Sequence, residues 1–493
     1  MSAGEAWDVV VVGAGVAGLV AARDLVRAGR RVVLVDGRDA PGGAVRGHDV
    51  AGLRLDAGAE SFATRGGAVA TLLDELGLRD DVVTPEPRGA WVHLTSGDGP
   101  LPRTGLLGVP AHPLAGDVRR TLGTRGALRA ALDLVLPARV GARATTFGAL
   151  VRARMGDAVA DRLVHPVVGG VHAADPDDLA TDTVAPGLAA ARADAGGSLA
   201  RGVRALRASA PAGSAVQGLR GGIHRLVDAL VADVTGHGGV VLTRTRATSL
   251  VRDADGTLVV RTEAAGTTAA PATAAGELRA PRVLLATPQA PALLAGLGAA
   301  DLASVATDDG VPVTLVTLVL DAPALDAAPR GTGVLVGPGV TDVTAKALTH
   351  ATAKWGWLAR TAPAGRHVVR LSFGRAPASG AGGAGGADGV PPADALLDVA
   401  LADASTLLGV PLAADALAGH AVVRWTQSLP RPSAAHRAAV AAVRAAVAGL
   451  PGVAVCGAWA AGTGLASVVP DARAAAATLL AATSDAPDDP AHN

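Results

Sequence analysis

The chain has 493 residues, enough for two or three domains that share one large interior. Apolar residues make up 49% and charged residues 18%, which excludes a disordered chain, and 44 basic against 44 acidic residues give no sign of nucleic acid as a partner. The single cysteine, Cys456, excludes a disulfide framework and a cysteine-based zinc or iron–sulfur site.

Two further features of composition limit what can be concluded. The chain has no Tyr, and only two of its 44 basic residues are lysines, Lys346 and Lys354. This bias is typical of a GC-rich bacterial genome, so the arginine excess says little about function. The N-terminus shows no signal segment, and the apolar stretch 283–300 is interrupted by Pro and Gly. We therefore expect a cytoplasmic protein.

The first elements form a βαβ unit, with a strand at 8–12, a helix over 16–28 and a strand at 31–35. Helical periods indicate a mainly helical lobe over 93–213. Downstream we expect a helix at 222–235, strands at 240–251, 257–262 and 282–286, long strands at 311–320 and 366–374, a helix at 434–449, a strand at 453–456 and a last helix from about Pro470. The low-complexity segment 377–392 reads as a surface loop, and the tail from Ser484 as frayed.

A dinucleotide fingerprint follows the first strand. Gly13 allows the tight turn, Gly15 lets a pyrophosphate approach the backbone, and Gly18 lets the helix pack close to the sheet. The start of the helix presents unpaired N–H groups to the phosphates. Asp36, 23 residues after Gly13, accepts hydrogen bonds from ribose hydroxyls. The contacts assigned around this turn are Gly13, Ala14, Gly15, Val16, Ala17, Gly18, Asp36, Gly37 and Arg38.

Two signals favour FAD over NAD. Gly42-Gly43 lies shortly after Asp36, where many flavoproteins bring a second glycine pair to the pyrophosphate. The segment 55–60 reads as a strand end and turn beside the flavin. The contacts assigned here are Gly42, Gly43, Ala44, Gly58, Ala59, Glu60 and Ser61.

The C-terminal region predicts a second cofactor contact. A strand, a Gly-rich turn and a helix follow one another over 453–471, and a helix start here can stabilise negative charge on the reduced flavin ring. The assigned contacts are Gly457, Gly464, Leu465 and Val468. The return of the C-terminus to an N-terminal cofactor is typical of an α/β, glutathione-reductase-like Rossmann FAD domain. We expect that domain to comprise 1–92, 214–300 and 430–493, with a substrate domain made of the helical lobe 93–213 and a mixed-sheet part 301–429.

Five blocks carry a resemblance that covers nearly the whole chain. They are 56–62 (DAGAESF), 165–172 (HPVVGGVH) with 174–175, 218–222 (GLRGG), 346–349 (KALT) with 354–355, and 424–425 (RW) with 429–430 and His436. In these blocks the chain resembles the oxygen-dependent porphyrinogen oxidases, within the wider amine-oxidase superfamily. That family comprises protoporphyrinogen oxidase and the coproporphyrin-forming coproporphyrinogen III oxidase of Gram-positive bacteria. The family often has Tyr where this chain has His172, and a basic residue where it has Ala44, so Arg46 is a substitute phosphate contact.

The resemblance implies six-electron oxidation of a porphyrinogen in haem biosynthesis, with one non-covalent FAD per chain, O₂ as acceptor and H₂O₂ as product. The flavin N5 does the chemistry, so no catalytic residue is assigned. Coproporphyrinogen III is the leading substrate and protoporphyrinogen IX the alternative. A flavin amine oxidase, a carotenoid desaturase and a non-enzymatic flavin protein are further alternatives. The family's next step adds transient contact with a ferrochelatase as an expectation, and peripheral membrane contact stays open.

The substrate is flat, apolar at its centre and anionic at its rim, so arginine should contact its propionates. Arg65 is the candidate, with a surface arginine as the alternative. Gly169 and Gly170 are assigned to close approach of the ring, with a structural turn as the alternative.

The remaining conspicuous residues are assigned structural roles. His165 and His172 lack a third partner, so no metal is expected. Lys354 reads as a strand-surface lysine rather than one beside flavin N5, and Cys456 as a buried strand residue without a flavin link. Trp355 and Trp357 read as core or sheet cover.

Overall fold

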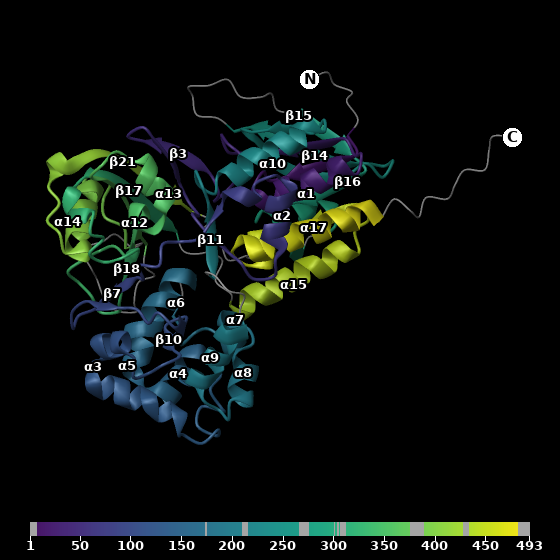
Figure 1. Cartoon of the computed structure of the whole chain (residues 1–493). Coiled ribbons are helices and arrows are strands. Elements are labelled where there is room, and N and C mark those ends of the chain that lie inside the picture. Colours follow the sequence, from purple (N-terminus) through teal and green to yellow (C-terminus); the bar gives the residue numbers. More distant parts are fainter. Residues whose placement is uncertain are drawn as a thin grey trace.

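The computed structural model describes residues 7–172, 175–209, 215–265, 276–299, 301–302, 305, 312–374, 389–426 and 433–481. Three lobes are visible in Figure 1: a nucleotide-binding lobe, a sheet lobe beside it, and a helical lobe below both. The described part contains no helix that combines the length and the apolarity needed to cross a membrane.

The nucleotide-binding lobe is built on five parallel strands in the order β12-β2-β1-β16-β22. These strands are β1 (Val9–Val12), β2 (Val32–Val35), β12 (Val240–Leu242), β16 (Arg282–Leu285) and β22 (Val453–Val455). They are short runs of Val, Leu and Ala because both faces of the sheet are covered. The order reverses beside β1, so a crevice is expected where β1 and β16 end, which is where such sheets bind ligands.

Helices cover one face of this sheet, and a small antiparallel sheet with further helices covers the other. The first set is α1 (Val16–Arg27), α2 (Ala68–Glu75), α10 (Arg225–Gly236) and α17 (Leu465–Ala481). The second set is β13 (Thr245–Arg252), β14 (Leu258–Ala264), β15 (Gly276–Ala280), α11 (Ala290–Leu294) and α15 (Ala434–Ala448), with the short α16 (Ala458–Ala461) after β22.

Three predicted boundaries in this lobe are wrong. The strand expected at 240–251 is two strands, because Arg244 has a φ of 52° and turns the chain out of the parallel sheet into the antiparallel one. The helix expected from 222 begins at Arg225, since Gly221 and Gly222 have positive φ values. The last helix begins at Leu465 instead of Pro470, which lies inside it on an exposed face.

The sheet lobe has seven strands in the order β21-β17-β20-β19-β18-β7-β8, antiparallel except between β18 and β7. They are β7 (Trp91–His93), β8 (Gly99–Pro100), β17 (Val313–Asp321), β18 (Gly333–Val336), β19 (Ala347–His350), β20 (Arg366–Phe373) and β21 (Leu417–Trp425). The helix α14 (Leu396–Leu408) packs on one face, and the short α12 (Ala351–Lys354) and α13 (Gly356–Thr361) follow β19. β7 straddles the predicted boundary at residue 92, and the division into domains stays a prediction.

Short strand pairs join the lobes. The hairpin of β3 (Gly47–Val50) and β4 (Leu53–Asp56) lies between the nucleotide-binding lobe and β21. A second small sheet has the order β5-β11-β6. Its strands are β5 (Phe62–Ala63), β6 (Val82–Val83) and β11 (Val216–Leu219).

The helical lobe contains α3 to α9 and the short pair β9–β10, and it has its own core. Its elements are β9 (Gly105–Leu106), β10 (Val109–Pro110), α3 (Gly116–Ala131), α4 (Phe147–Met155), α5 (Asp157–Val159), α6 (His165–His172), α7 (Thr181–Val184), α8 (Leu188–Asp194) and α9 (Leu199–Ser209). A π-helical turn, η3 (Ala160–Val164), joins α5 to α6. The predicted helical character of this segment is confirmed.

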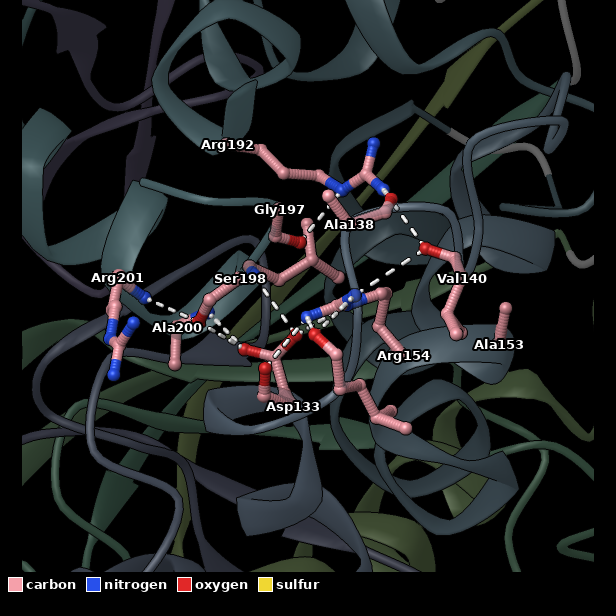
Figure 2. A network of polar contacts seen from close by, with 12 residues as sticks. Asp133, Ala138, Val140, Ala153, Arg154, Arg192, Gly197, Ser198, Ala200 and Arg201 are labelled. Carbon is pink, nitrogen blue, oxygen red and sulfur yellow. Dashed lines mark hydrogen bonds and ion pairs between the residues drawn. The ribbon is translucent and has the colours of Figure 1, made fainter. Parts of the chain in front are cut away.

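A buried polar network holds the helical lobe together (Figure 2). The side chains of Asp133 and Arg154 are fully buried, and their Oδ1 and Nε lie 2.7 Å apart. Asp133 also accepts hydrogen bonds from the Ser198 hydroxyl and from the backbone N–H groups of Leu199 and Ala200. Since these N–H groups begin α9, the carboxylate caps that helix and ties it to α4.

The predicted loop at 377–392 lies mostly outside the described residues, and the predicted tail from Ser484 lies wholly outside them.

Candidate functional site

The turn between β1 and α1 has the geometry expected of a phosphate-binding loop. Gly13 has a φ of 105°, and a Cβ on it would lie 2.6 Å from the carbonyl oxygen of Ala286, just after β16. A Cβ on Gly18 would lie 1.8 Å from the carbonyl oxygen of Gly13. No atom lies within 4 Å of the Cβ position of Gly15. Gly13 and Gly18 are therefore glycines for packing, and Gly15 leaves open space in front of the start of α1.

A second glycine pair closes on this loop from the other side. The N–H of Gly42 donates to the carbonyl of Ala14 at 2.7 Å, and Gly15 and Gly42 form a parallel bridge. A Cβ on Gly43 would lie 3.3 Å from the Cα of Gly15. The two glycine segments therefore touch each other, beside the open space that Gly15 leaves in front of the start of α1.

Asp36 ties the end of β2 to the same loop. Its carboxylate accepts hydrogen bonds from the N–H groups of Ala14 at 2.7 Å and Arg38 at 2.8 Å. Each oxygen keeps a lone pair for a further donor such as a ribose hydroxyl. A guanidinium nitrogen of Arg38 lies 3.9 Å from the Cβ position of Gly43, whereas Arg46 pairs with Asp39 and lies over the ring of Trp425. Arg38 is thus the cation beside the glycine pair.

The loop after β1, the glycine pair Gly42-Gly43 and the end of β2 together form what is called the cradle below. The segment after β4 continues it. The N–H of Ala59 donates to the carbonyl of Ala44 at 3.0 Å, and a Cβ on Gly58 would lie 2.1 Å from the same oxygen. Arg65 donates from Nη2 to the hydroxyl of Ser467 in the first turn of α17, at 3.0 Å. Residues 58–65 therefore run from the glycine pair to the C-terminal helix.

The C-terminal turn meets the start of α1. A Cβ on Gly457, directly after β22, would lie 3.7 Å from the Cβ of Ala17, and α1 and α17 pack side by side (Figure 1). Gly464 precedes α17 with a φ of 99° and open space at its Cβ position, and Leu465 and Val468 are buried behind it. Asp471 fixes the turn by accepting the N–H of Gly457 at 3.0 Å.

These residues fit FAD. Two helices begin at the same cradle, and glycines at both starts face open space. The first N–H groups of a helix favour an anion. The cradle includes every residue that the sequence predicted as a cofactor contact on the first loop, the glycine pair, the 58–61 segment and the C-terminal turn. Because no ligand tests the individual contacts, each of those assignments stays a prediction.

Cys456 is fully buried directly after β22, and burial raises the pKa of its thiol well above the usual range. Cys456 is thus a buried residue, as predicted, and a neutral thiol is a poor nucleophile. Binding of FAD without a covalent link stays a prediction. Trp355 is also buried, against Gly218, as predicted for a core residue.

Three charged side chains gather on the 58–61 segment. Glu60 pairs with Lys354 Nζ at 2.5 Å and with Arg370 Nη2 at 3.2 Å, and all three side chains are mostly buried. Burial acts to raise the pKa of Glu60, but the two cations lower it to about 2. The prediction that Lys354 is a strand-surface lysine is wrong, because it ends α12 and turns inward to this carboxylate. Arg370 was missed, and its only signal was a charge within the apolar strand β20.

The substrate candidates lie in two places, Arg65 beside α17 and the two glycines inside α6. Arg65 is exposed beside the first turn of α17. Gly169 and Gly170 lie inside α6, so a structural turn is not their role. A Cβ on Gly170 would lie 3.2 Å from Leu335 of β18, whereas nothing lies within 4 Å at Gly169. Gly170 therefore serves close packing, and Gly169 is the better candidate for approach of a flat ligand.

His165 and His172 begin and end α6, directly after the π-helical turn η3. His165 faces Asp175 at 3.7 Å. In the described part of the chain, no group of three His, Cys, Asp or Glu side chains could hold a metal ion.

The flavin containing amine oxidoreductase family model matches residues 16–480. The chain belongs to this family. In sequence, the chain is 30% identical to the coproporphyrinogen III oxidase of Propionibacterium freudenreichii, over 97% of this chain and 92% of that protein. It is 29% identical to the coproporphyrinogen III oxidase of Mycobacterium tuberculosis, over 96% of this chain and 97% of that protein.

The fold agrees with that of a solved structure. The crystal structure of a putative protoporphyrinogen oxidase from Exiguobacterium superposes with a TM-score of 0.78, at 24% identity, covering 97% of this chain and 99% of that chain. The predicted resemblance, the α/β flavin fold and FAD as the cofactor are thereby confirmed. The chain is an FAD-dependent oxidoreductase.

Proposed function

We propose that the chain oxidises coproporphyrinogen III to coproporphyrin III, with O₂ as electron acceptor. The observation that carries the proposal is the pairing of a loop geometry that fits FAD with similarity over nearly the full length to proteins named for this reaction. Three O₂ accept six electrons and six protons to give three H₂O₂. Bound FAD supplies the hydride-accepting chemistry at N5.

The chain's own residues hold the FAD and orient the substrate. The start of α1, Gly15 and Gly43 bind the pyrophosphate through backbone N–H groups, and Asp36 takes the ribose. Aromatisation of the macrocycle drives the reaction, so no strong base is required. Arg65 pairs with a propionate at the rim, and Gly169 admits the flat ring beside α6.

Protoporphyrinogen IX is the second candidate substrate, supported by the name of the Exiguobacterium protein. An aerobic assay at equal concentrations of the two porphyrinogens, following porphyrin fluorescence and peroxide together, separates them. We expect faster turnover of coproporphyrinogen III, and equal or better use of protoporphyrinogen IX would refute that choice. A Gly15→Ala variant that lacks FAD measures the non-enzymatic background. Cytoplasmic location and transient contact with a ferrochelatase stay predictions.

A further inference from the structure

The cluster of Glu60, Lys354 and Arg370 carries more positive than negative charge. Lys354 and Arg370 come from α12 and β20 of the sheet lobe, whereas Glu60 belongs to the cradle segment. The exposed fractions of the three side chains are 12% for Glu60, 18% for Lys354 and 14% for Arg370. One carboxylate faces two cations in a site shielded from water.

Arg370 is fixed to the backbone of the cradle. Its Nη1 donates to the carbonyl of Gly58 at 2.7 Å, and the carbonyl of Asp56 lies 3.4 Å away. The next N–H along, at Ala59, holds the carbonyl of Ala44 beside the glycine pair. The cluster is therefore attached to the stretch between the pyrophosphate loop and the first turn of α17.

The Asp56 carboxylate makes its contacts outside the cluster. The carboxylate of Asp56 is turned to the start of α10, where it accepts from the N–H groups of Ile223 and His224 and from His224 Nδ1. Burial, together with Arg370 and Arg54, lowers the pKa of His48, so this side chain adds no charge at neutral pH. The local balance of the cluster is one positive charge.

We propose that this uncompensated charge of the Glu60–Lys354–Arg370 cluster stabilises negative charge on the flavin, with Lys354 and Arg370 as positioning residues that act through their field. The inference rests on the proposed function, because it takes the flavin end of FAD to lie on residues 58–61. A flavin that accepts a hydride at N5 gains negative charge over N1 and C2=O. A cation held nearby in a partly buried site favours that charged form.

Sulfite is a suitable probe, because it adds to N5 of oxidised flavin and leaves the ring anionic, and it needs no porphyrinogen. In Lys354→Met the cluster becomes neutral, so the dissociation constant for sulfite should rise by roughly tenfold or more. In Glu60→Gln the cluster carries two positive charges, so the dissociation constant should fall by a similar factor. Arg366→Met is the control, since Arg366 lies on the same strand but pairs with exposed Asp321; it should leave the constant unchanged.

Opposite changes in the dissociation constant for sulfite distinguish an electrostatic effect from a structural one. A cluster that only fastened the two lobes together would be weakened by both changes, so shifts in the same direction, or shifts no larger than in Arg366→Met, overturn the inference. The flavin midpoint potential, measured on the same samples, should follow the sulfite order, and FAD content shows that each variant is loaded.

The two proposals fail separately. Opposite shifts in a protein that turns over no porphyrinogen support the charge effect and refute the proposed substrate. Turnover of coproporphyrinogen III without the opposite shifts refutes the charge effect alone. A wild-type protein that binds no FAD refutes both.

Discussion

At the scale of single residues, a fully buried ion pair stabilises the helical lobe. Replacing Arg154 by Met leaves the Asp133 carboxylate with three hydrogen bonds but without its counter-ion, in a fully buried position. Removing one partner of a buried ion pair costs about 3–5 kcal/mol. We therefore expect the apparent melting temperature to fall by several degrees, measured by circular dichroism.

The control for Arg154→Met is Arg143→Met, which removes an exposed arginine from the same lobe (Figure 2 shows the buried pair). This variant should have the same melting temperature as the wild-type protein. Equal melting temperatures for Arg154→Met and the wild type would contradict the importance of the network.

His93 gives the sheet lobe a pH dependence. Its Nδ1 lies 2.5 Å from Asp98 and its Nε2 3.1 Å from Asp342. Burial acts to lower the pKa of His93, but these hydrogen bonds and charges outweigh it, so the pKa is raised above 6.5. A raised pKa in the folded state stabilises the fold fully below pH 6.5, and this contribution is lost as the pH rises through the raised value.

The test compares His93→Gln with the wild type. The loss of melting temperature caused by the substitution should be largest below pH 6.5 and should shrink toward alkaline pH, since the histidine is then neutral in both states. A difference that stays constant over the whole range would show that His93 contributes only uncharged hydrogen bonds.

The residue roles that could be predicted from sequence are those set by local geometry. Gly13 has the positive φ of a tight turn and Gly18 packs against the carbonyl of Gly13, so both constraints lie inside one turn and the spacing predicts them. The contact of Gly15 with a pyrophosphate stays a prediction. The Glu60 cluster could not be found in this way, because Lys354 stands 294 residues from Glu60 and Arg370 stands 312 from Gly58. A fold must bring such residues together before their charges can be added.

At the scale of elements, the start of α1 allows a matched pair of substitutions. Gly15→Ala places a methyl group in space that only the cofactor would occupy, so FAD content should fall sharply while the apo protein keeps its melting temperature. Gly18→Ala would push a methyl group into the backbone of Gly13, which should reduce the free energy of unfolding by roughly 1–3 kcal/mol or more. It should therefore lower both the FAD content and the melting temperature of the apo protein. The ratio of flavin to protein absorbance and the apo melting temperature give the two readings.

The pair distinguishes a ligand contact from a packing contact. If Gly15→Ala kept its FAD, or if it destabilised the apo protein as much as Gly18→Ala, the open space at Gly15 would not be the pyrophosphate site.

The elements themselves were predictable where pattern and chemistry agreed. The βαβ opening and the Ala-rich α15 were found because apolar period and turn residues coincide. The start of α17 was misplaced because Pro470 is typical of a first helical turn, yet the helix begins earlier and leaves the carbonyl of Ala466 without the N–H that Pro lacks.

At the scale of the whole molecule, the proposed reaction draws on all three lobes, because the cradle, the charge cluster and α6 come from different ones. The helix α6 belongs to the helical lobe but packs on β18 of the sheet lobe through Gly170. No period in the sequence shows such contacts between lobes. The resemblance to a family pointed to the residues of α6, and only the fold shows which of the two glycines faces open space.

Gly169 provides the last prediction. Gly169→Leu adds a branched side chain where no atom lies within 4 Å, so it should obstruct the flat macrocycle without disturbing the packing of α6. We expect KM for coproporphyrinogen III to rise by roughly tenfold or more, with FAD content and melting temperature unchanged, since a steric block acts on the substrate alone. Gly116→Leu, at another open position of the same lobe, is the control and should leave KM unchanged. An unaltered KM in Gly169→Leu would place the macrocycle elsewhere and leave Arg65 as the only substrate contact to pursue.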